Sequence, residues 1–427
     1  MNNNISLNSD NNIQLPSLAD FQAAKVRLSN VINHTPLMEN FNLSSTFNSK
    51  IYLKREDLQV VRSYKIRGAY NKMSTLSDEQ AKNGIVCASA GNHAQGVALS
   101  CYKLGIKGKI YMPSTTTDQK IRSVKMFGKE NVEIVLIGDT FDDAFAEAMK
   151  DCEKNNKAFI HPFDDEKVIE GQGTVGLEIF QDIQEPLDYI FLPIGGGGLA
   201  AGVSSYAKQI SPKTKIIGVE PAGAASMKKA FEEGKVITLS EIDPFVDGAA
   251  VKRVGSKNFD ICQKTLEDII LIPEGQICSD ILMLYNQEGI IVEPAGALTI
   301  SALNYYQDKI KDKTVVCIIS GGNNDITRMA EINERSLLFK KLKHYFIIKF
   351  PQRAGALKEF LVNVLGPDDD ICLFEYTKKT NRENGPALIG IELKNSNDYQ
   401  PLLERMEKYK INYKLLNENI ELFNILI

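Results

Sequence analysis

One lysine stands in a setting that suits either chemistry or simple solvation. The segment VVRSYKIRGAY spans residues 60–70 and places Lys65 between a serine-tyrosine pair and an arginine-glycine-alanine turn. Most lysines in polar segments are surface residues with a solvated charge. A buried lysine, in contrast, is partly neutral and can act as a nucleophile or a base. The local sequence allows both interpretations, so partners must be sought elsewhere in the chain.

A run of glycines forms the strongest candidate for an anion site. Residues 195–198 are all glycine; they follow the apolar segment IFLPI and precede LAAG. Adjacent glycines let several backbone N–H groups point at one place, and a helix N-terminus adds partial positive charge. A flexible linker is the alternative, but linkers are not set between a buried strand and a buried helix. The pattern therefore favours binding of phosphate or another anion.

The identity of that anion stays open on spacing alone. Gly195, Gly197 and Ala200 satisfy the spacing of a dinucleotide-binding turn. Glu220 ends the next apolar segment, about where such folds place an acid that binds the ribose. The chain could therefore also be an NAD-dependent dehydrogenase. That interpretation predicts nicotinamide binding and no covalent bond between a lysine and a cofactor.

A second turn lies within CASAGNHAQGVA. Ser89, Ala90, Gly91 and Asn92 form the turn, and His93 begins the following helix. The exposed amides of such a turn can hold a carboxylate. The Asn92 amide can bond a ligand hydroxyl, or it can simply cap the helix. We do not expect His93 to be a base, because a helix N-terminus disfavours the charged imidazole.

Ser320 follows the apolar segment VVCII and precedes two glycines. A serine at the carboxyl end of a strand is well placed to bond a ligand. The segment ISGGN is not the GxSxG turn of serine nucleophiles, and only His344 follows it along the chain. We therefore expect Ser320 to be a hydrogen-bonding partner rather than a nucleophile.

These residues must be positioned by an α/β fold. From residue 85 onward, short apolar segments alternate with amphipathic segments of helical length, which predicts open parallel sheets with ligands at the carboxyl ends of the strands. After about residue 340 the order becomes strand, helix, strand, strand, helix, strand, which is typical of a ferredoxin-like domain. We expect a disordered lead at 1–20, a catalytic domain at 21–335 and a C-terminal domain at 341–423, with EINERSLLFKKLK as a connecting helix.

Composition limits the partners. The chain has 427 residues, 43% hydrophobic and 24% charged, with a formal net charge of -4 and no basic stripe. The sequence therefore predicts no basic surface that would bind nucleic acid or an anionic membrane, and we expect small-molecule ligands instead. The seven cysteines are scattered without CxxC pairs or nearby histidines, which predicts no metal site and reduced thiols in a cytoplasmic protein. No segment is long enough to span a bilayer.

Taken together, the motifs resemble the fold-type II family of pyridoxal-phosphate enzymes, and within it the threonine dehydratases. The matching segments occur in the family's order: TPL at 35–37, YLKREDLQ at 52–59, SYKIRGAY, SAGNHAQG, GGGGL, EPAGA at 293–297 and SGGN. FPQRAGALKEFL and LFEYTK are similar to the single ACT-like regulatory module of the shorter biosynthetic threonine dehydratases. The resemblance implies two open parallel-sheet subdomains followed by a ferredoxin-like α+β domain.

The resemblance also implies residue roles toward pyridoxal 5'-phosphate. Lys65 would be the Schiff-base lysine, Asn92 would bond the ring hydroxyl and Ser320 would bond the pyridine nitrogen. The residues expected to wrap the phosphate are Gly195, Gly196, Gly197, Gly198 and Leu199. Those expected to hold the substrate carboxylate are Ser89, Ala90, Gly91, Asn92 and His93.

The implied activity is β-elimination of L-threonine, and less well of L-serine, to 2-oxobutanoate (from serine, pyruvate) and ammonia. It would be the first step of isoleucine biosynthesis, with L-isoleucine as effector and a homotetrameric assembly. Two features depart from the family's pattern: only one ACT-like module is present, and Ala354 stands at a proline position. The direction and strength of regulation therefore stay open, as does any dependence on monovalent cations.

Other interpretations remain. A catabolic serine/threonine dehydratase or a β-replacing enzyme would share the fold, but the C-terminal module and SYKIRGA argue against both. A non-catalytic amino-acid sensor would keep the fold without the chemistry, yet every expected cofactor-contacting residue type is present. The roles of Glu56, Asp247 and Glu293 are open between the site and ordinary surface or helix-cap duties.

Overall fold

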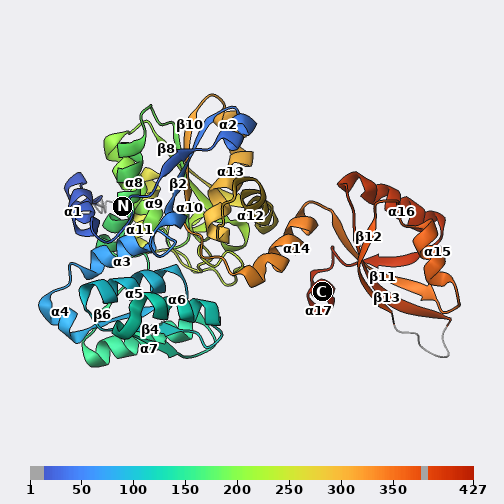
Figure 1. Cartoon of the computed structure of the whole chain (residues 1–427), viewed down its shortest axis with the longest axis horizontal. Coiled ribbons are helices and arrows are strands. Elements are labelled where there is room, and N and C mark those ends of the chain that lie inside the picture. The colour runs from blue at the N-terminus through green and yellow to red at the C-terminus, as the bar shows by residue number, and fades with distance from the viewer. Residues whose placement is uncertain (1–13, 377–382) are drawn as a thin grey trace, which may run out of the picture. The chain divides into compact units, whose positions relative to one another are not determined.

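The computed structural model describes residues 14–376 and 383–427 (Figure 1). The chain divides into two units, Met1–Asp325 and Ile326–Ile427. Residues 1–13 of the expected lead lie outside the described residues, and helix α1 (Leu18–Leu28) begins inside its last part. A capping box explains this start, because Ser17 accepts from the Asp20 amide while the Asp20 side chain accepts from the Ser17 amide.

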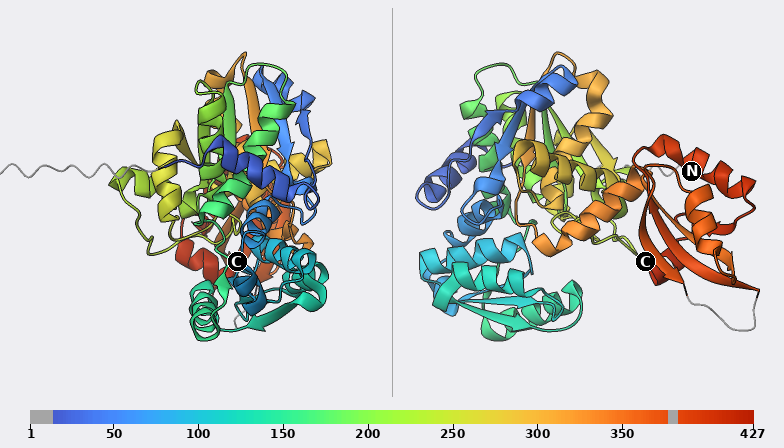
Figure 2. Two further views of the ribbon diagram at one scale, coloured as in Figure 1. Left: turned by 90° about the vertical axis from the view of Figure 1, so that its left-hand side faces the viewer. Right: turned by 45° about the vertical axis from the view of Figure 1, so that its right-hand side comes forward.

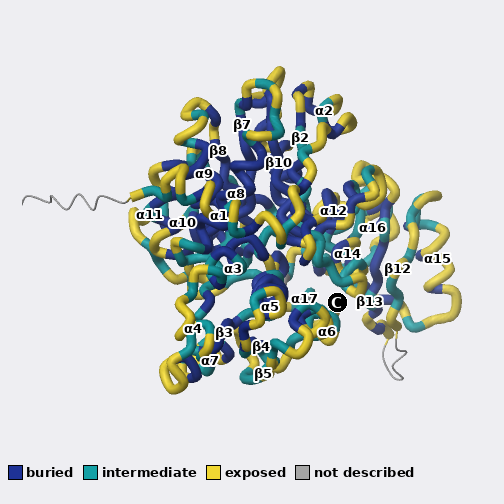
Figure 3. The backbone as a smooth tube through the Cα atoms, turned by 60° about the vertical axis from the view of Figure 1, so that its left-hand side comes forward, coloured by how far each residue is buried: buried dark blue, intermediate teal, exposed yellow. Residues whose placement is uncertain are grey.

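The first unit contains a six-stranded sheet in the order β1-β2-β10-β7-β8-β9. Its strands are β1 (Leu37–Glu39), β2 (Lys50–Arg55), β10 (Thr314–Ile319), β7 (Tyr189–Pro193), β8 (Lys215–Pro221) and β9 (Asp268–Ile272). All neighbours are parallel except β1, which pairs antiparallel with β2. Every residue of β7 and β10 is buried, as expected of a parallel sheet covered on both faces (Figures 2 and 3).

Helices on the two faces of this sheet account for its apolar strands. They are α2 (Phe41–Phe47), α8 (Glu166–Asp182), α9 (Gly198–Ile210), α10 (Ser226–Glu233), α11 (Ser256–Thr265), α12 (Glu274–Glu288) and α13 (Pro294–Ile310). Helix α8 packs along α9, and α13 packs against β7 and β10. Among the described residues, no helix combines the length and apolarity needed to cross a bilayer.

A second, four-stranded parallel sheet in the same unit has the order β5-β4-β3-β6. Its strands are β5 (Val132–Leu136), β4 (Gly108–Met112), β3 (Ile85–Ala88) and β6 (Ala158–Phe159). The associated helices are α3 (Lys65–Met73), α4 (Asp78–Asn83), α5 (Asn92–Leu104), α6 (Asp118–Gly128) and α7 (Phe141–Asn155). The two sheets confirm the expected pair of α/β subdomains.

The second unit is an α+β domain with an antiparallel sheet in the order β12-β13-β11-β14. Its elements are α14 (Met329–Phe339), β11 (Lys343–Pro351), α15 (Ala356–Asn363), β12 (Asp370–Tyr376), β13 (Asn384–Glu392), α16 (Tyr399–Lys408), β14 (Asn412–Leu415) and α17 (Ile420–Leu426). The predicted ferredoxin-like order and the helix in EINERSLLFKKLK are both present. Helix α17 was not predicted.

Alternation along β11 explains the core of this unit. Phe346, Ile348 and Phe350 are buried, whereas Lys349 and Pro351 are exposed. Because successive side chains of a strand point to opposite faces, the aromatic residues line one face of the sheet. There they pack with residues of α15, α16 and β13 in a single hydrophobic cluster.

Replacing Phe346 with alanine should lower the free energy of unfolding by about 3–5 kcal/mol, because the loss of a fully buried ring leaves a cavity. Urea unfolding of the full chain measures the change. The matched control is Leu357→Ala on α15, where the side chain is 39% exposed and the expected change is about 0.5 kcal/mol. Equal effects of the two variants would contradict this description of the core.

Candidate active site

Two loops that are far apart in the sequence run side by side and bring Lys65 close to the end of β10. Ser63 and Gly321 form an isolated antiparallel bridge. The Tyr64 amide donates to the Ser320 carbonyl at 3.2 Å, and the Gly322 amide donates to the Arg62 carbonyl at 2.9 Å. The segment that precedes α3 is therefore anchored to the carboxyl end of a central strand, where ligands of open α/β sheets bind.

Lys65 is the first residue of α3 and is half-buried rather than exposed. Its Nζ donates to the Pro162 carbonyl at 3.0 Å. Burial lowers the pKa of Lys65 to about 8, and the nearby Glu293 carboxylate opposes this shift only in part. A neutral amine is therefore accessible to Lys65 near physiological pH, as a nucleophilic lysine requires.

A buried network of charges fixes the first turn of α3. The Arg67 guanidinium, which has no solvent exposure, donates to Glu56 at 2.8 Å from both Nε and Nη2. Its Nη1 donates to Glu178 at 2.7 Å. Lys54 Nζ donates to Glu178 at 2.7 Å and to the Thr35 carbonyl at 2.6 Å. Two cations and two anions are thus fully paired, and Glu56 serves this network rather than the surface or a helix cap.

The glycine loop between β7 and α9 has the geometry of an anion cradle. Gly197 has φ +91°, a left-handed conformation that side chains disfavour, and a Cβ at Gly196 would lie 2.2 Å from the Phe163 ring. Among the described residues, the amides of 195–199 donate to no backbone or side-chain acceptor. These free N–H groups lie at the start of α9, where the helix dipole is positive. The loop therefore fits the phosphate of pyridoxal phosphate.

The acid expected for dinucleotide binding is engaged elsewhere. Both carboxylate oxygens of Glu220 accept backbone amides, from Met227 and Lys228, each at 2.8 Å. The side chain is fully buried, and burial raises the pKa of Glu220 to about 8. Glu220 thus secures the start of α10 and has no free oxygen for a ribose, which argues against the NAD interpretation.

Asn92 is not the cap of α5, so that alternative is wrong. The N-cap is Gly91, and no side chain caps this helix. The Asn92 Nδ2 instead donates to both carboxylate oxygens of Glu293, at 2.7 and 2.8 Å. Its Oδ1 accepts from Asn323 Nδ2 at 2.7 Å. The amide is therefore held between two partners from distant segments.

The turn from Ser89 to His93 has free amides that suit a carboxylate. Among the described residues, the amides of Ala90, Asn92 and His93 have no acceptor, whereas the Gly91 amide donates to Ser89 Oγ at 3.3 Å. The His93 ring bonds the Ile160 carbonyl at 2.8 Å. Burial, with a smaller effect of the Lys65 charge, lowers the pKa of His93 to about 3, so the ring stays neutral and is unsuited to be a base.

Ser320 lies directly after β10 and is 1% exposed. Within the described part of the chain its hydroxyl makes no hydrogen bond, which leaves it available to a ligand atom. His344 cannot be assigned as its base, because that ring bonds the Lys341 carbonyl and stacks on Tyr399 at 3.9 Å in the second unit. The structure is therefore consistent with Ser320 as a hydrogen-bonding residue and not a nucleophile.

Several residues of this site carried no signal in the sequence. Asn258 Nδ2 donates to the carbonyls of Gly196, at 2.8 Å, and Phe163, at 3.1 Å, and so braces the glycine loop. Asn323 belongs to the SGGN motif but was assigned no role. Asp247, left open by the sequence, forms an ion pair with Lys120 at 2.7 Å. Their contacts join segments that are distant in sequence, so pattern reasoning could not identify them.

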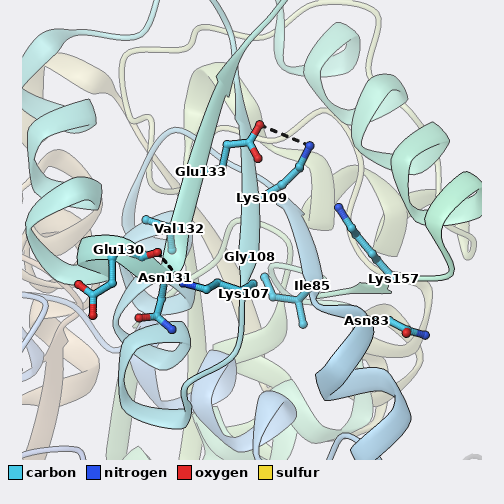
Figure 4. Close-up of a pocket in the computed structure, with 10 residues that line it drawn as sticks. All are labelled: Asn83, Ile85, Lys107, Gly108, Lys109, Glu130, Asn131, Val132, Glu133 and Lys157. Carbon is cyan, nitrogen blue, oxygen red and sulfur yellow. Dashed lines mark hydrogen bonds and ion pairs between the residues drawn. The ribbon is translucent and has the colours of Figure 1, made fainter.

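A shallow hollow elsewhere in the first unit is not the site (Figure 4). It lies at the amino ends of β3, β4 and β5, whereas the glycine loops follow the carboxyl ends of their strands. Its lysines already have partners: Lys109 pairs with Glu133 at 3.4 Å, and Lys107 donates to the Glu130 carbonyl at 2.8 Å. Among the described residues no cluster could hold a metal ion, and none of the seven cysteines, all of which are described, forms a disulfide bond.

Comparisons with known proteins agree with this geometry. A family model described as pyridoxal-phosphate dependent enzyme matches residues 28–321, so fold and site define an enzyme that uses this cofactor. A second model, the C-terminal regulatory domain of threonine dehydratase, matches residues 334–426. The biosynthetic L-threonine dehydratase IlvA of Halalkalibacterium halodurans is 60% identical over 96% of this chain and 99% of that relative. The chain belongs to the threonine dehydratase family, which confirms the resemblance seen in its motifs.

Further relatives extend the match. The corresponding protein of Bacillus subtilis is 57% identical over 95% of this chain and 96% of the relative. Among solved structures, processed threonine deaminase isoform 2 of Solanum lycopersicum gives a TM-score of 0.71 at 43% identity, covering 75% of this chain and 92% of that one. The structure of maize serine racemase gives a TM-score of 0.70 at 29% identity, covering 76% of this chain and 98% of that one. The fold is thus shared by enzymes named for different reactions.

Replacing Arg67 with methionine should cost about 3–5 kcal/mol of unfolding free energy, because buried Glu56 and Glu178 would lose their partner. The control Arg353→Met removes an exposed ion pair with Glu359 and should cost less than about 1 kcal/mol. Urea unfolding measures both. Similar losses in the two variants would contradict the importance of the buried network.

The same network predicts a pH dependence. Burial alone would raise the pKa of Glu178, but Arg67 and Lys54 outweigh it and hold the pKa below its ordinary value of 4.5. The unfolded chain therefore takes up this proton at a higher pH than the folded chain, and stability falls as pH drops below about 5. Arg67→Met should show a smaller loss over that range in urea unfolding, and an unchanged slope would contradict the assignment.

Proposed function

We propose that this chain converts L-threonine to 2-oxobutanoate and ammonia in the first step of isoleucine biosynthesis. The observation that carries the proposal is the convergence of a partly neutral, half-buried lysine with two turns whose backbone amides are free. One turn suits the phosphate of the cofactor, and the other suits the carboxylate of an amino acid. The names of the most similar relatives, biosynthetic L-threonine dehydratases, support threonine as that amino acid.

The residues present fit the bound cofactor. Lys65 would hold its aldehyde carbon, Asn92 its ring hydroxyl and Ser320 its pyridine nitrogen, with the phosphate held by Gly195, Gly196, Gly197, Gly198 and Leu199. When bound, pyridoxal phosphate supplies an electron sink for cleavage of a bond at the substrate Cα. The hydroxyl of Ser320 carries no charge, so it cannot keep the pyridine nitrogen protonated as a carboxylate would. This favours expulsion of the β-hydroxyl over transamination.

Residues of the chain would bind the substrate carboxylate and remove the proton from the substrate Cα. The backbone amides of Ala90, Asn92 and His93 would orient the substrate carboxylate. Ser89 shapes this turn, because its hydroxyl oxygen accepts a hydrogen bond from the Gly91 amide. Lys65, freed when the substrate amine takes its place on the cofactor, would take the proton from the substrate Cα as a neutral amine. One methyl group distinguishes threonine from serine and is worth about 1–3 kcal/mol in an apolar pocket. We therefore expect weaker activity on L-serine, which gives pyruvate.

The second unit points to control of the activity. It matches the regulatory domain of threonine dehydratase, and a biosynthetic enzyme gains from inhibition by its end product. We propose L-isoleucine as the effector, a cytoplasmic location and a homotetrameric assembly, with the catalytic region at 21–335 and the regulatory region at 341–423. A catabolic dehydratase would have no need of an amino-acid sensor, so the matched regulatory domain favours the biosynthetic role.

Lys65→Ala should lower 2-oxobutanoate release from L-threonine at least about a thousandfold, because both the cofactor anchor and the base are lost. The control is Lys72→Ala on the same helix, where the ammonium forms a partly exposed ion pair with Asp165 at 2.7 Å. This control should keep its activity. A keto-acid assay on cofactor-loaded protein tests both, and full activity of Lys65→Ala would remove the mechanism.

L-Isoleucine should suppress keto-acid release by the full chain, and a chain that ends at Asp325 should deaminate L-threonine without responding to L-isoleucine. Retained activity of the shortened chain shows that its catalytic unit is folded. Inhibition that persists without residues 326–427 would place the effector site in the first unit and contradict the proposed role of the second.

A further inference from the structure

Glu293 precedes α13, but its side chain points into the candidate active site and does not cap this helix. It holds the N-cap position of α13, yet its side chain makes no capping bond. It is 5% exposed, and its carboxylate turns to Asn92. A Cβ on Gly321 would lie 2.5 Å from Glu293 Oε1, so the carboxylate uses space that only a glycine leaves open. The helix-cap interpretation of Glu293 is therefore wrong.

Glu293 and Asn323 together determine which way the Asn92 amide points. An asparagine amide can turn over unless its partners distinguish oxygen from nitrogen. Asn92 Oδ1 accepts from Asn323 Nδ2, and the same Asn323 nitrogen donates to the Val61 carbonyl at 2.9 Å, which fixes Asn323 as the donor. Asn92 Nδ2 approaches both oxygens of Glu293 almost equally, so a single N–H pointing between them accounts for both contacts. The other N–H remains for a ligand.

Charged groups from three other segments face Glu293: Lys65 on α3, Lys120 on α6 and Asp247 in the loop before α11. Burial raises the pKa of Glu293 to about 7, so the carboxyl group exchanges its proton near physiological pH. Its negative form stabilises a positive charge on Lys65. Glu293 thus contacts Asn92 and acts electrostatically on Lys65.

We propose that Glu293 is a positioning residue that holds the Asn92 amide so that its second N–H is donated to the ring hydroxyl of the cofactor, while its carboxylate charge favours the protonated Lys65 nitrogen. This role rests on the proposed function, in which Asn92 bonds the ring hydroxyl. It explains why a carboxylate is buried here beside two asparagines instead of capping α13.

A double-variant cycle on the full-length holoenzyme tests the positioning role. Glu293→Ala should weaken binding of pyridoxal phosphate about tenfold in equilibrium dialysis, the range of a charge-assisted hydrogen bond. In an Asn92→Ala background the same substitution should change binding less than about twofold, because the group that it positions is gone. The control Glu170→Gln alters another buried carboxyl group, which pairs with Lys167 at 2.8 Å, and should leave cofactor binding unchanged.

A spectroscopic titration tests the charge effect and does not depend on turnover. Glu293→Gln keeps an acceptor for Asn92 but removes the charge. The visible absorbance of the bound cofactor reports protonation at the Lys65 nitrogen, and its pH midpoint should shift down by about one unit, since a carboxylate stabilises the positive form. A role confined to packing would leave this midpoint in place.

Equal effects of Glu293→Ala with and without Asn92, or an unshifted midpoint in Glu293→Gln, would overturn the proposal. The expected coupling and shift, together with 2-oxobutanoate release from L-threonine by the unaltered enzyme, would support it along with the proposed function. The same coupling and shift without such release would support the role of Glu293 and overturn only the proposed substrate.

Discussion

The buried ion pairs of Arg67 with Glu56 and Glu178 are the constraint on which the site depends. They join the first turn of α3 to the end of β2 and to α8, and Lys54 completes the charge balance. Burying such charges is costly unless each one is paired. The pairing therefore fixes the positions of α3, β2 and α8 relative to one another. That arrangement also sets the position of Lys65, two residues before Arg67 on the same helix.

Around this fixed helix, the site is assembled from unpaired backbone groups. The bridge between Ser63 and Gly321 ties the lysine segment to β10, and the glycine loop and the turn after β3 carry free amides that suit two anions. Backbone amides at helix starts bind anions without mobile charged side chains. Burial, and not a neighbouring positive charge, keeps the Lys65 amine partly neutral.

The sequence predicted the alternating strands, the glycine loop and the separate C-terminal domain because each rests on local patterns of apolar residues and turns. It did not predict β1, β2, β6, β9 or α17, which are short or depend on tertiary pairing. The bracing of the glycine loop by Asn258 and the orientation of Asn92 by Glu293 also escaped prediction. Such contacts join segments that are distant in sequence, and no period or spacing records them.

The most direct test of the central claim is to identify the residue that binds the cofactor. Borohydride reduction of the holoenzyme fixes the cofactor to its lysine, and mass spectrometry of a proteolytic digest then locates the added mass. The structure predicts the pyridoxyl group on Lys65, whose Nζ lies beside the Pro162 carbonyl in the first unit. A modification found only at another lysine would contradict both the placement of the site and the mechanism drawn from it.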